Sequence, residues 1–342
     1  MNCTLLIPGL FWARETADAV LSGIELPALT ELLSRARRQP VTHGTLAAWL
    51  CASHGIARQR DWPIAPLTLA HDGVDPGDAY WLRADPVHIR VERDGLTFVA
   101  TALLALSDEE SQALAASLKA HFEAIGIAFH APSARRWYVN AAGTPDLVTH
   151  APDEVAGRDV QASLPHGDDA LQWHGVFNEA QMLLHAHPVN AGREDCGAPT
   201  VNSIWFWGGG TRPRVATRPF THVWSDNAEA TAVAAASGAR TAALPGEAQT
   251  LLQQAHDATP EHLVVLDQLA APAAYRDADV WRDRLAQLEP AWFSPLAAAL
   301  RSGTLKRLTL IALATDGGVR FDVTRGDLLK FWRGRKPLSQ LA

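Results

Sequence analysis

Three short apolar runs near the two ends of the chain constrain its fold most. They are residues 3–8 (CTLLIP), 262–267 (HLVVLD) and 306–315 (KRLTLIALAT), and segments with helical periodicity stand between them. Buried strands that alternate with helices are typical of a parallel sheet covered on both faces. The residues at 201–207 (VNSIWFW) and 221–225 (THVWS) are assigned to the same sheet. The flanks of the chain therefore predict an α/β core.

The helices expected for this core begin and end at ordinary helix signals. The segment 27–38 begins with Pro27 and ends in basic residues, and the segment 43–56 closes at Gly55. Both features suit helix termini. Further helices are expected at 168–187, 226–237, 246–256 and 277–302.

The middle of the chain has a different pattern. Residues 80–106 indicate a hairpin with its turn at 92–95, and Ser107 with Glu110 forms a capping box for a helix that runs to about Ile125. Another strand is expected at 135–139. We therefore predict a discontinuous α/β core formed by 1–79 and 168–342, with a smaller α+β domain, 80–167, inserted into it.

Composition excludes several classes of protein. A net charge of −7 and a pI near 6.0 argue against a nucleic-acid partner. No apolar stretch reaches the roughly 18 residues of a membrane span, and the first residues lack a secretory cleavage pattern, so a cytoplasmic location is expected. The three cysteines are odd in number and lack CxxC spacing, which argues against a disulfide framework or a zinc–thiolate site.

The densest polar cluster follows the helix at 168–187. Asn178, Gln181 and His185 lie on one face of this helix. His187, Asn190 and Arg193 lie around and beyond Pro188, which ends the helix. Amides, imidazoles and a guanidinium in one place could bind a carboxylate or a phosphate. The alternative is a capped, partly buried polar helix end with no ligand.

A second cluster, Arg83, Asp85 and His88, lies on an otherwise apolar strand. It could face a ligand, or Arg83 and Asp85 could form a structural ion pair. Asn202 precedes the triple glycine 208–210, which lets the backbone approach a ligand closely. The sequence contains no dinucleotide fingerprint, phosphate-binding loop, GxSxG or HExxH motif.

The order of these motifs resembles a known family. One passage is similar to a passage of the archaeal-type cofactor-independent phosphoglycerate mutases: His187-Pro188-Val189-Asn190, then Arg193, Gly197 and 201–210. The residues at 152–160 resemble the element that precedes this passage in the family. The whole chain also resembles the RpfE-type regulatory proteins of bacteria, on the residues at 61–66 and 81–88. The resemblance implies an alkaline-phosphatase-like core with an inserted substrate domain, two divalent metals and a Ser nucleophile.

The chain departs from the residues that the resemblance implies for chemistry. The first strand ends at Pro8-Gly9 where the family has a metal-ligating Asp. Asp267 is not followed by a His four residues later, and Asp316 precedes Gly317 rather than a His. For a nucleophile, only Thr42 and Thr45 are near the expected place. No catalytic residue and no intact metal site are expected, with Asp267 and Asp316 as the residual metal candidates.

The leading hypothesis is a degenerate, non-mutase relative, a pseudoenzyme with a regulatory role. It would bind a small phosphorylated or carboxylated ligand, or a protein partner, without a cofactor. The groups expected to face an anion are Arg83, His185, His187, Asn190 and Arg193, with Asp85, His88, Asn178 and Asn202 beside them. Two alternatives stay open: an active phosphomutase or phosphatase with a rearranged Mn or Mg site, and an interaction module built on the twelve Trp residues.

Overall fold

The computed structural model describes residues 1–342 except 93–94, 101–102, 142, 255–259, 331 and 342. The chain divides into two compact units. The first unit joins both ends of the chain, Met1–His54 with Ala216–Ala342, and the second is the intervening segment Gly55–Val215. In the described part of the chain, no helix has both the length and the apolar character needed to cross a lipid bilayer.

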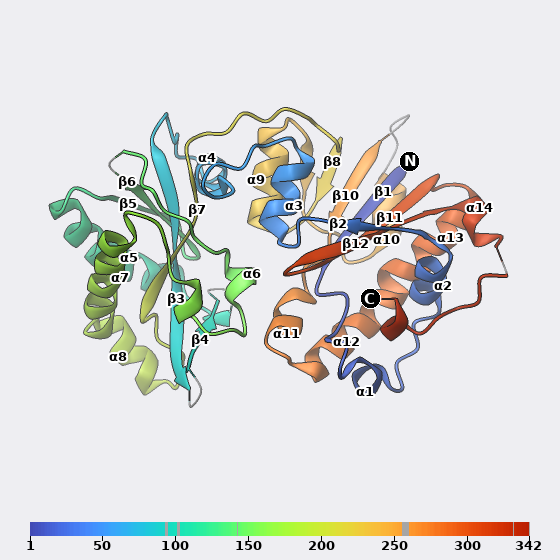
Figure 1. Ribbon diagram of the computed structural model, residues 1–342, viewed down its shortest axis with the longest axis horizontal. Helices are drawn as coiled ribbons and strands as arrows, with labels where there is room; N and C mark the ends of the chain where they lie inside the picture. Colours follow the sequence, from blue (N-terminus) through green and yellow to red (C-terminus); the bar gives the residue numbers. More distant parts are fainter. Residues whose placement is uncertain (93–94, 101–102, 142, 255–259, 331, 342) are drawn as a thin grey trace. The chain divides into compact units, whose positions relative to one another are not determined.

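The first unit is built on one mostly parallel sheet in the order β2-β12-β11-β1-β10-β8-β9. Strands β11, β1, β10, β8 and β9 run parallel to one another. At one edge, β12 pairs antiparallel with β11, and β2 pairs antiparallel with β12 (Figure 1). The strands are β1 (Asn2–Pro8), β2 (Arg37–Val41), β8 (His222–Trp224), β9 (Arg240–Ala242), β10 (Glu261–Val265), β11 (Arg307–Ala314) and β12 (Gly317–Thr324). This sheet confirms the predicted α/β class.

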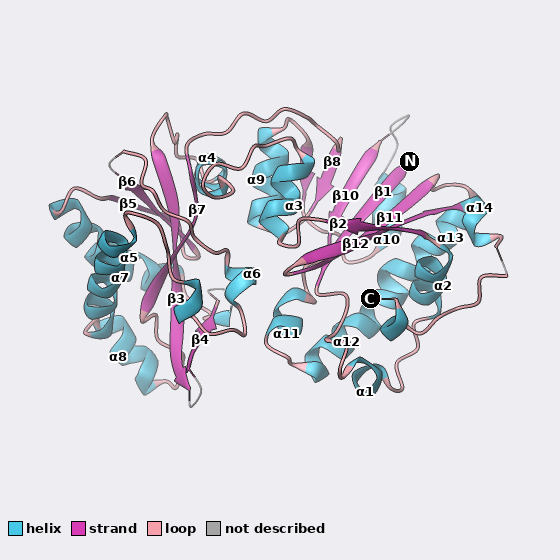
Figure 2. Ribbon diagram, in the orientation of Figure 1, coloured by secondary structure: helices cyan, strands magenta, loops and turns pink. Residues whose placement is uncertain are grey.

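Helices cover both faces of this sheet (Figure 2). They are α1 (Ala17–Leu21), α2 (Pro27–Arg35), α3 (Leu46–Ser53), α9 (Ala228–Ala236), α10 (Ala248–Gln254), α11 (Ala270–Ala274), α12 (Ala278–Leu288), α13 (Ser294–Ser302) and α14 (Arg325–Leu328). The main core joins α2, α10, α12 and α13 to one face through side chains such as Leu5, Leu32 and Leu296. Helices α3 and α9 pack together, with Trp49 of α3 over the opposite face.

The start of α2 shows how distant segments complete a helix. Leu26, at the N-cap, has no side chain that can accept from the first turn. The buried carboxylate of Glu289 supplies this cap, since it accepts from Ala28 N at 2.6 Å and from Leu29 N at 3.1 Å. A negative charge at a helix N-terminus also interacts favourably with the helix dipole.

The second unit is an α+β unit with an antiparallel sheet in the order β4-β3-β6-β5, and β7 pairs with β3 beside it. Its strands are β3 (Tyr80–Glu92), β4 (Gly95–Val99), β5 (Ala128–Ser133), β6 (Arg136–Ala141) and β7 (Ser203–Gly210). Its helices are α4 (Ile64–His71), α5 (Asp108–Ala124), α6 (Pro152–Val155), α7 (Ala170–His185) and α8 (Pro188–Asp195). The capping box of Ser107 and Glu110 is present at α5.

Two expectations differ from the structure. The second unit, Gly55–Val215, is longer at both ends than the predicted 80–167, because α4 packs on β7 and β3 and because β7 pairs with β3. Strand β7 is antiparallel, whereas the apolar run at 201–207 was assigned to the parallel core. Every residue of β7 is buried. A fully buried strand has a continuous apolar sequence in a parallel or an antiparallel sheet, so this pattern alone does not assign the strand to either.

The helix expected at 27–38 is also too long. It ends at Arg35, and Arg37–Val41 forms the edge strand β2. Its residues from Arg37 to Pro40 are exposed. Proline is tolerated at a sheet edge because no ladder bond is lost there. Two residues of the predicted turn at 92–95 lie outside the described residues.

Candidate functional site

Arg83 and Asp85 form a buried ion pair on β3. Arg83 Nε donates to Asp85 Oδ1 at 2.9 Å and Nη2 donates to Oδ2 at 2.8 Å, and the two residues are 3% and 4% exposed. Trp207 Nε1 also donates to Asp85 Oδ2 at 2.8 Å. The guanidinium lies 5.0 Å from the centre of the Trp207 ring and 5.4 Å from that of Tyr138. This environment corresponds to the structural alternative, because both charges are satisfied inside the unit.

His88 and Asn202 join β3 to the chain before β7. His88 Nδ1 lies 2.9 Å from Thr200 O. The Asn202 side-chain amide accepts from Ile89 N at 2.7 Å and donates to Ile89 O at 2.8 Å, as the main chain of a paired strand would. Burial, together with the nearby Arg90 charge, lowers the pKa of His88, so its imidazole is neutral at pH 7. A neutral ring provides no fixed positive charge for an anion.

Asn190 is held between α7 and the start of β7. Its Nδ2 donates to Leu184 O at 2.7 Å and to Val201 O at 2.8 Å, and its Oδ1 accepts from Val201 N at 2.8 Å. The residue is 3% exposed. Every polar atom of this amide group therefore has a main-chain partner.

Arg193 has a similar role on α8. Its Nε donates to Pro199 O at 2.7 Å, its Nη1 to Glu110 Oε2 at 2.7 Å, and its Nη2 to Leu104 O. Arg193 is 5% exposed. The guanidinium thus joins α8 and the nearby segment before β7 to the start of α5, which lies far earlier in the sequence.

The remaining predicted residues lie apart from these buried groups. His187 caps α8, because its Nδ1 accepts from Val189 N at 3.2 Å, and its Nε2 lies 3.1 Å from Ser117 Oγ. Asn178 and His185 are exposed on α7. Gln181, from the same predicted face, donates to Ser203 Oγ at 3.3 Å.

The segment 199–202 connects most of the predicted residues. Consecutive residues of this segment bond alternately to α8 and to β3: Pro199 to Arg193, Thr200 to His88, Val201 to Asn190 and Asn202 to Ile89. We call this arrangement the 199–202 clamp. The clamp brings together four of the predicted residues: His88, Asn190, Arg193 and Asn202. Their hydrogen bonds hold β3, α8 and the start of β7 together.

The resemblance places chemistry at the carboxyl edge of the first unit's sheet, where ligands bind in open α/β sheets. Gly9 follows β1 there with a φ of +74°. A Cβ on Gly9 would lie 2.7 Å from Leu269 O and 3.0 Å from the Ala273 side chain. The Gly9 carbonyl also accepts from Trp281 Nε1 at 2.8 Å. This position has no room for a carboxylate side chain.

The residual metal candidates do not assemble a cation site. Asp267 Oδ2 accepts from Asn227 Nδ2 at 3.2 Å, and Asn227 in turn caps α9. Burial, with the charges of Glu229 and Asp226, raises the pKa of Asp267. Asp316 is exposed in the turn between β11 and β12.

The proposed nucleophile positions are equally unsuited. Thr45 caps α3, since its Oγ1 accepts from Ala48 N at 3.2 Å, and Thr42 is exposed. Among the residues that the structure describes, no group of three or more His, Cys, Asp or Glu is placed to hold a metal ion. The donor set at this edge does not fit the two divalent metals that the resemblance implies.

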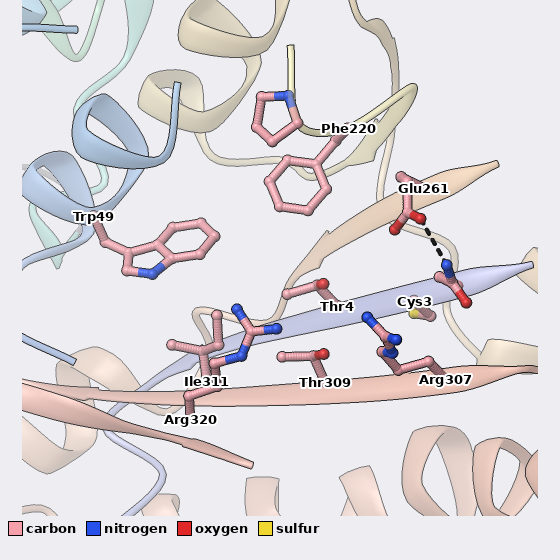
Figure 3. A pocket seen from close by; sticks show the side chains of 11 residues that line it. Cys3, Thr4, Trp49, Phe220, Glu261, Arg307, Thr309, Ile311 and Arg320 are labelled. Carbon is pink, nitrogen blue, oxygen red and sulfur yellow. Dashed lines mark hydrogen bonds between the residues drawn. The ribbon is translucent and has the colours of Figure 1, made fainter. Parts of the chain in front are cut away.

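A pocket of about 190 Å³ lies at the opposite, amino end of the same sheet (Figure 3). Its floor is formed by β1, β10, β11 and β12, and its walls include Trp49 and Phe220. Sequence reasoning missed this pocket. The available signal was the polar residues Thr4 and Thr309 inside runs that were treated as uniformly apolar.

Comparison with known proteins supports the fold. The chain matches no protein-family model. It is similar to the 2,3-bisphosphoglycerate-independent phosphoglycerate mutase of Methanothrix thermoacetophila, at 38% identity over 68 residues, which cover 20% of this chain and 17% of the relative. The Methanosarcina mazei mutase of the same name is 27% identical over 111 residues, 32% of this chain and 28% of the relative. The matched segments thus span less than a third of these relatives.

Two solved structures align with nearly the whole chain. A cofactor-independent phosphoglycerate mutase from Thermoplasma acidophilum has a TM-score of 0.51 at 15% identity, over 100% of this chain and 95% of the other. A protein from Pyrococcus horikoshii has a TM-score of 0.51 at 13% identity, over 94% and 87%. At these identities the likeness shows the fold, a mixed α/β fold with a mostly parallel sheet flanked by helices.

Proposed function

We propose that this protein is a non-mutase relative of the cofactor-independent phosphoglycerate mutases and that it acts by binding rather than by metal-assisted phosphoryl transfer. The end of β1, at Pro8-Gly9, carries this proposal. A two-metal mechanism needs several carboxylates and imidazoles to hold its cations against a phosphate. Where the resemblance implies a ligating Asp, β1 ends at Pro8, whose side chain has no metal-ligating atom. A Cβ on the next residue, Gly9, would lie 2.7 Å from Leu269 O.

The neighbouring positions support the same proposal. Asp267 accepts a hydrogen bond from the Asn227 amide, and the Thr45 hydroxyl caps α3. By resemblance to the RpfE-type proteins, the binding role would be regulatory and cytoplasmic. The ligand would be a small carboxylated or phosphorylated molecule, or a protein partner.

No specific observation favours either of the two alternatives, the Trp-based interaction module or the enzyme with a rearranged metal site. An interaction module built on Trp would need an exposed Trp patch. Ten of the twelve Trp are buried, Trp62 is partly buried, and Trp332 is 69% exposed. A rearranged metal site would need a donor set that the described residues do not assemble.

The test is a phosphoryl-transfer assay on chelator-treated protein. We expect no interconversion of 3- and 2-phosphoglycerate and no hydrolysis of p-nitrophenyl phosphate after addition of Mn²⁺, Mg²⁺, Zn²⁺ or Co²⁺. A cofactor-independent mutase treated in the same way is the positive control. Metal-dependent turnover would refute the proposal: its loss in Asp267→Asn would place the metal at Asp267, and its survival would place the metal elsewhere.

A further inference from the structure

The pocket at the amino end of the first unit's sheet has an unusual floor. Central strands of a parallel sheet are covered on both faces and normally carry apolar side chains. Here Asn2 of β1 is in register with Glu261 of β10 and with Arg307 of β11, and Thr4 is in register with Thr309. Register partners point to the same face. A polar strip therefore crosses three adjacent strands where apolar side chains are expected.

Several groups on this strip are open to a ligand. No hydrogen bond or ion pair of the Arg307 side chain, nor of the Thr4 hydroxyl, is found among the described residues. Glu261 accepts from Asn2 Nδ2 through Oε1 at 2.6 Å, which leaves Oε2 available. Glu261 and Arg307 are not paired with each other, because β1, which carries Asn2, lies between their strands. The strip thus presents a negative and a positive group on opposite sides of Asn2.

A second arginine at the far end of the floor is already neutralised. Arg320 donates to Asp322 through Nε at 2.8 Å and through Nη2 at 2.9 Å. Thr309 Oγ1 donates to the same carboxylate at 2.7 Å. Asp322 also attracts Arg307 electrostatically but forms no hydrogen bond with it among the described contacts, so Arg307 is the cation of the floor best placed to meet a carboxylate.

The walls of the pocket are apolar. The ring centres of Trp49 and Phe220 lie 6.2 Å apart, and Pro219 and Ile311 complete this side. The volume of about 190 Å³ is below the roughly 300–1,000 Å³ of sites for drug-sized ligands. A single amino acid is of suitable size, whereas a nucleotide is too large.

The distance between the strands of the two charged groups restricts how far apart the charges of the ligand can be. The strands of Glu261 and Arg307 are two strand spacings apart, about 9.5 Å. An ammonium and a carboxylate on one carbon, each held by a charge-assisted hydrogen bond of about 2.8 Å, span this width. We propose that this pocket binds a free α-amino acid with an apolar side chain, its carboxylate on Arg307, its ammonium on Glu261 and its side chain against Trp49 and Phe220.

The chemistry of the pocket is binding rather than covalent catalysis. Cys3, which borders it, has a pKa raised to about 12 by burial and by the nearby Glu261 charge. Its thiol therefore stays protonated and is a poor nucleophile. This inference rests on the binding role proposed above and gives that role a ligand class.

The test is calorimetric titration of the full chain with four probes. L-Phenylalanine carries all three recognised features, 3-phenylpropanoate lacks the ammonium, phenethylamine lacks the carboxylate, and inorganic phosphate is an anion alone. We expect L-phenylalanine to bind, and each of the others to bind at least about tenfold more weakly, because each loses a hydrogen bond between charged groups.

Two variants test the assigned contacts. Arg307→Met and Glu261→Gln should each weaken phenylalanine binding by about tenfold or more, whereas the matched controls Lys306→Met and Glu247→Gln should not. Thermal unfolding without ligand verifies that each variant is folded. The proposal is overturned if phenylalanine does not bind at millimolar concentration, if any of the other three probes binds as tightly, or if Arg307→Met or Glu261→Gln binds phenylalanine like the native protein. Such a failure is distinct from failure of the non-mutase proposal, which only metal-dependent turnover would produce.

Discussion

The buried pair of Arg83 and Asp85 offers the sharpest test of whether the predicted anion-facing residues are structural. In Asp85→Asn the amide oxygen can still accept from Trp207 Nε1, so the substitution isolates the loss of one charge. Arg83, 3% exposed, is then a buried cation without its carboxylate. Breaking a buried pair in this way costs about 3–5 kcal/mol. For a unit of this size, 1 kcal/mol corresponds to about 2–4 °C, so the melting temperature should fall by about 6–20 °C.

The double variant Arg83→Met with Asp85→Asn removes both charges and keeps the acceptor for Trp207. Replacing a buried pair by neutral groups is often close to neutral in stability. We expect it to recover at least half of the loss, with a remaining cost from the cation–π contacts of about 0.5–2 kcal/mol. Differential scanning calorimetry of native protein, both single variants and the double variant measures the coupling. The reasoning is refuted if Asp85→Asn melts within about 3 °C of the native protein.

Three further predictions concern other buried contacts. Arg193→Met should destabilise the second unit by about 3 kcal/mol or more, and Arg193→Lys should recover only part of this, since lysine cannot reach three separate acceptors; equal urea midpoints for Lys and Arg would contradict the 199–202 clamp. Although burial raises the pKa of Asp72, hydrogen bonds from Arg136 and Tyr138 outweigh it and lower the pKa overall. Because the folded pKa is depressed, its stabilisation is present above the ordinary value of about 3.9 and is lost as the pH falls further. Urea unfolding from pH 7 to pH 3 should therefore show a shallower acid loss in Asp72→Asn, and parallel curves would disprove this. Gly9→Asp should destabilise the first unit by about 2 kcal/mol or more, through its φ of +74° and the contact with Leu269 O; a Mn²⁺-dependent recovery of melting temperature would instead indicate a metal site.

Local signals in the sequence were sufficient for much of the fold. The capping box of Ser107 and Glu110 is complete within four residues, so it could be predicted and is present. The apolar runs of β1, β10 and β11 also appear as strands of the parallel sheet. Strand β7 could not be placed, because its partner β3 lies more than a hundred residues earlier and burial alone does not specify direction.

The candidate site shows the same limit more clearly. The sequence identified Asn190 and Arg193 as an unusual polar group, but most of their partners are main-chain groups, which every residue type carries. A pattern of side chains therefore cannot tell a ligand-facing amide from one that holds the main chain. In contrast, Thr4 and Thr309 broke an apolar pattern, and that break was a readable signal.

These observations separate what the chain shares with the mutases from what it lacks. The motif that resembles them, from His187 to Gly210, consists largely of the 199–202 clamp and strand β7, whose buried hydrogen bonds hold the second unit together. Losing one of these bonds leaves a buried polar group unpaired, which is costly whatever the protein does. The positions where the resemblance implies metal ligands have contacts of their own: the Gly9 carbonyl accepts from Trp281 Nε1 at 2.8 Å, and Asp267 Oδ2 accepts from Asn227 Nδ2 at 3.2 Å. A resemblance in such a clamp is therefore a sign of common fold, and the function must be sought from sites such as the amino-end pocket.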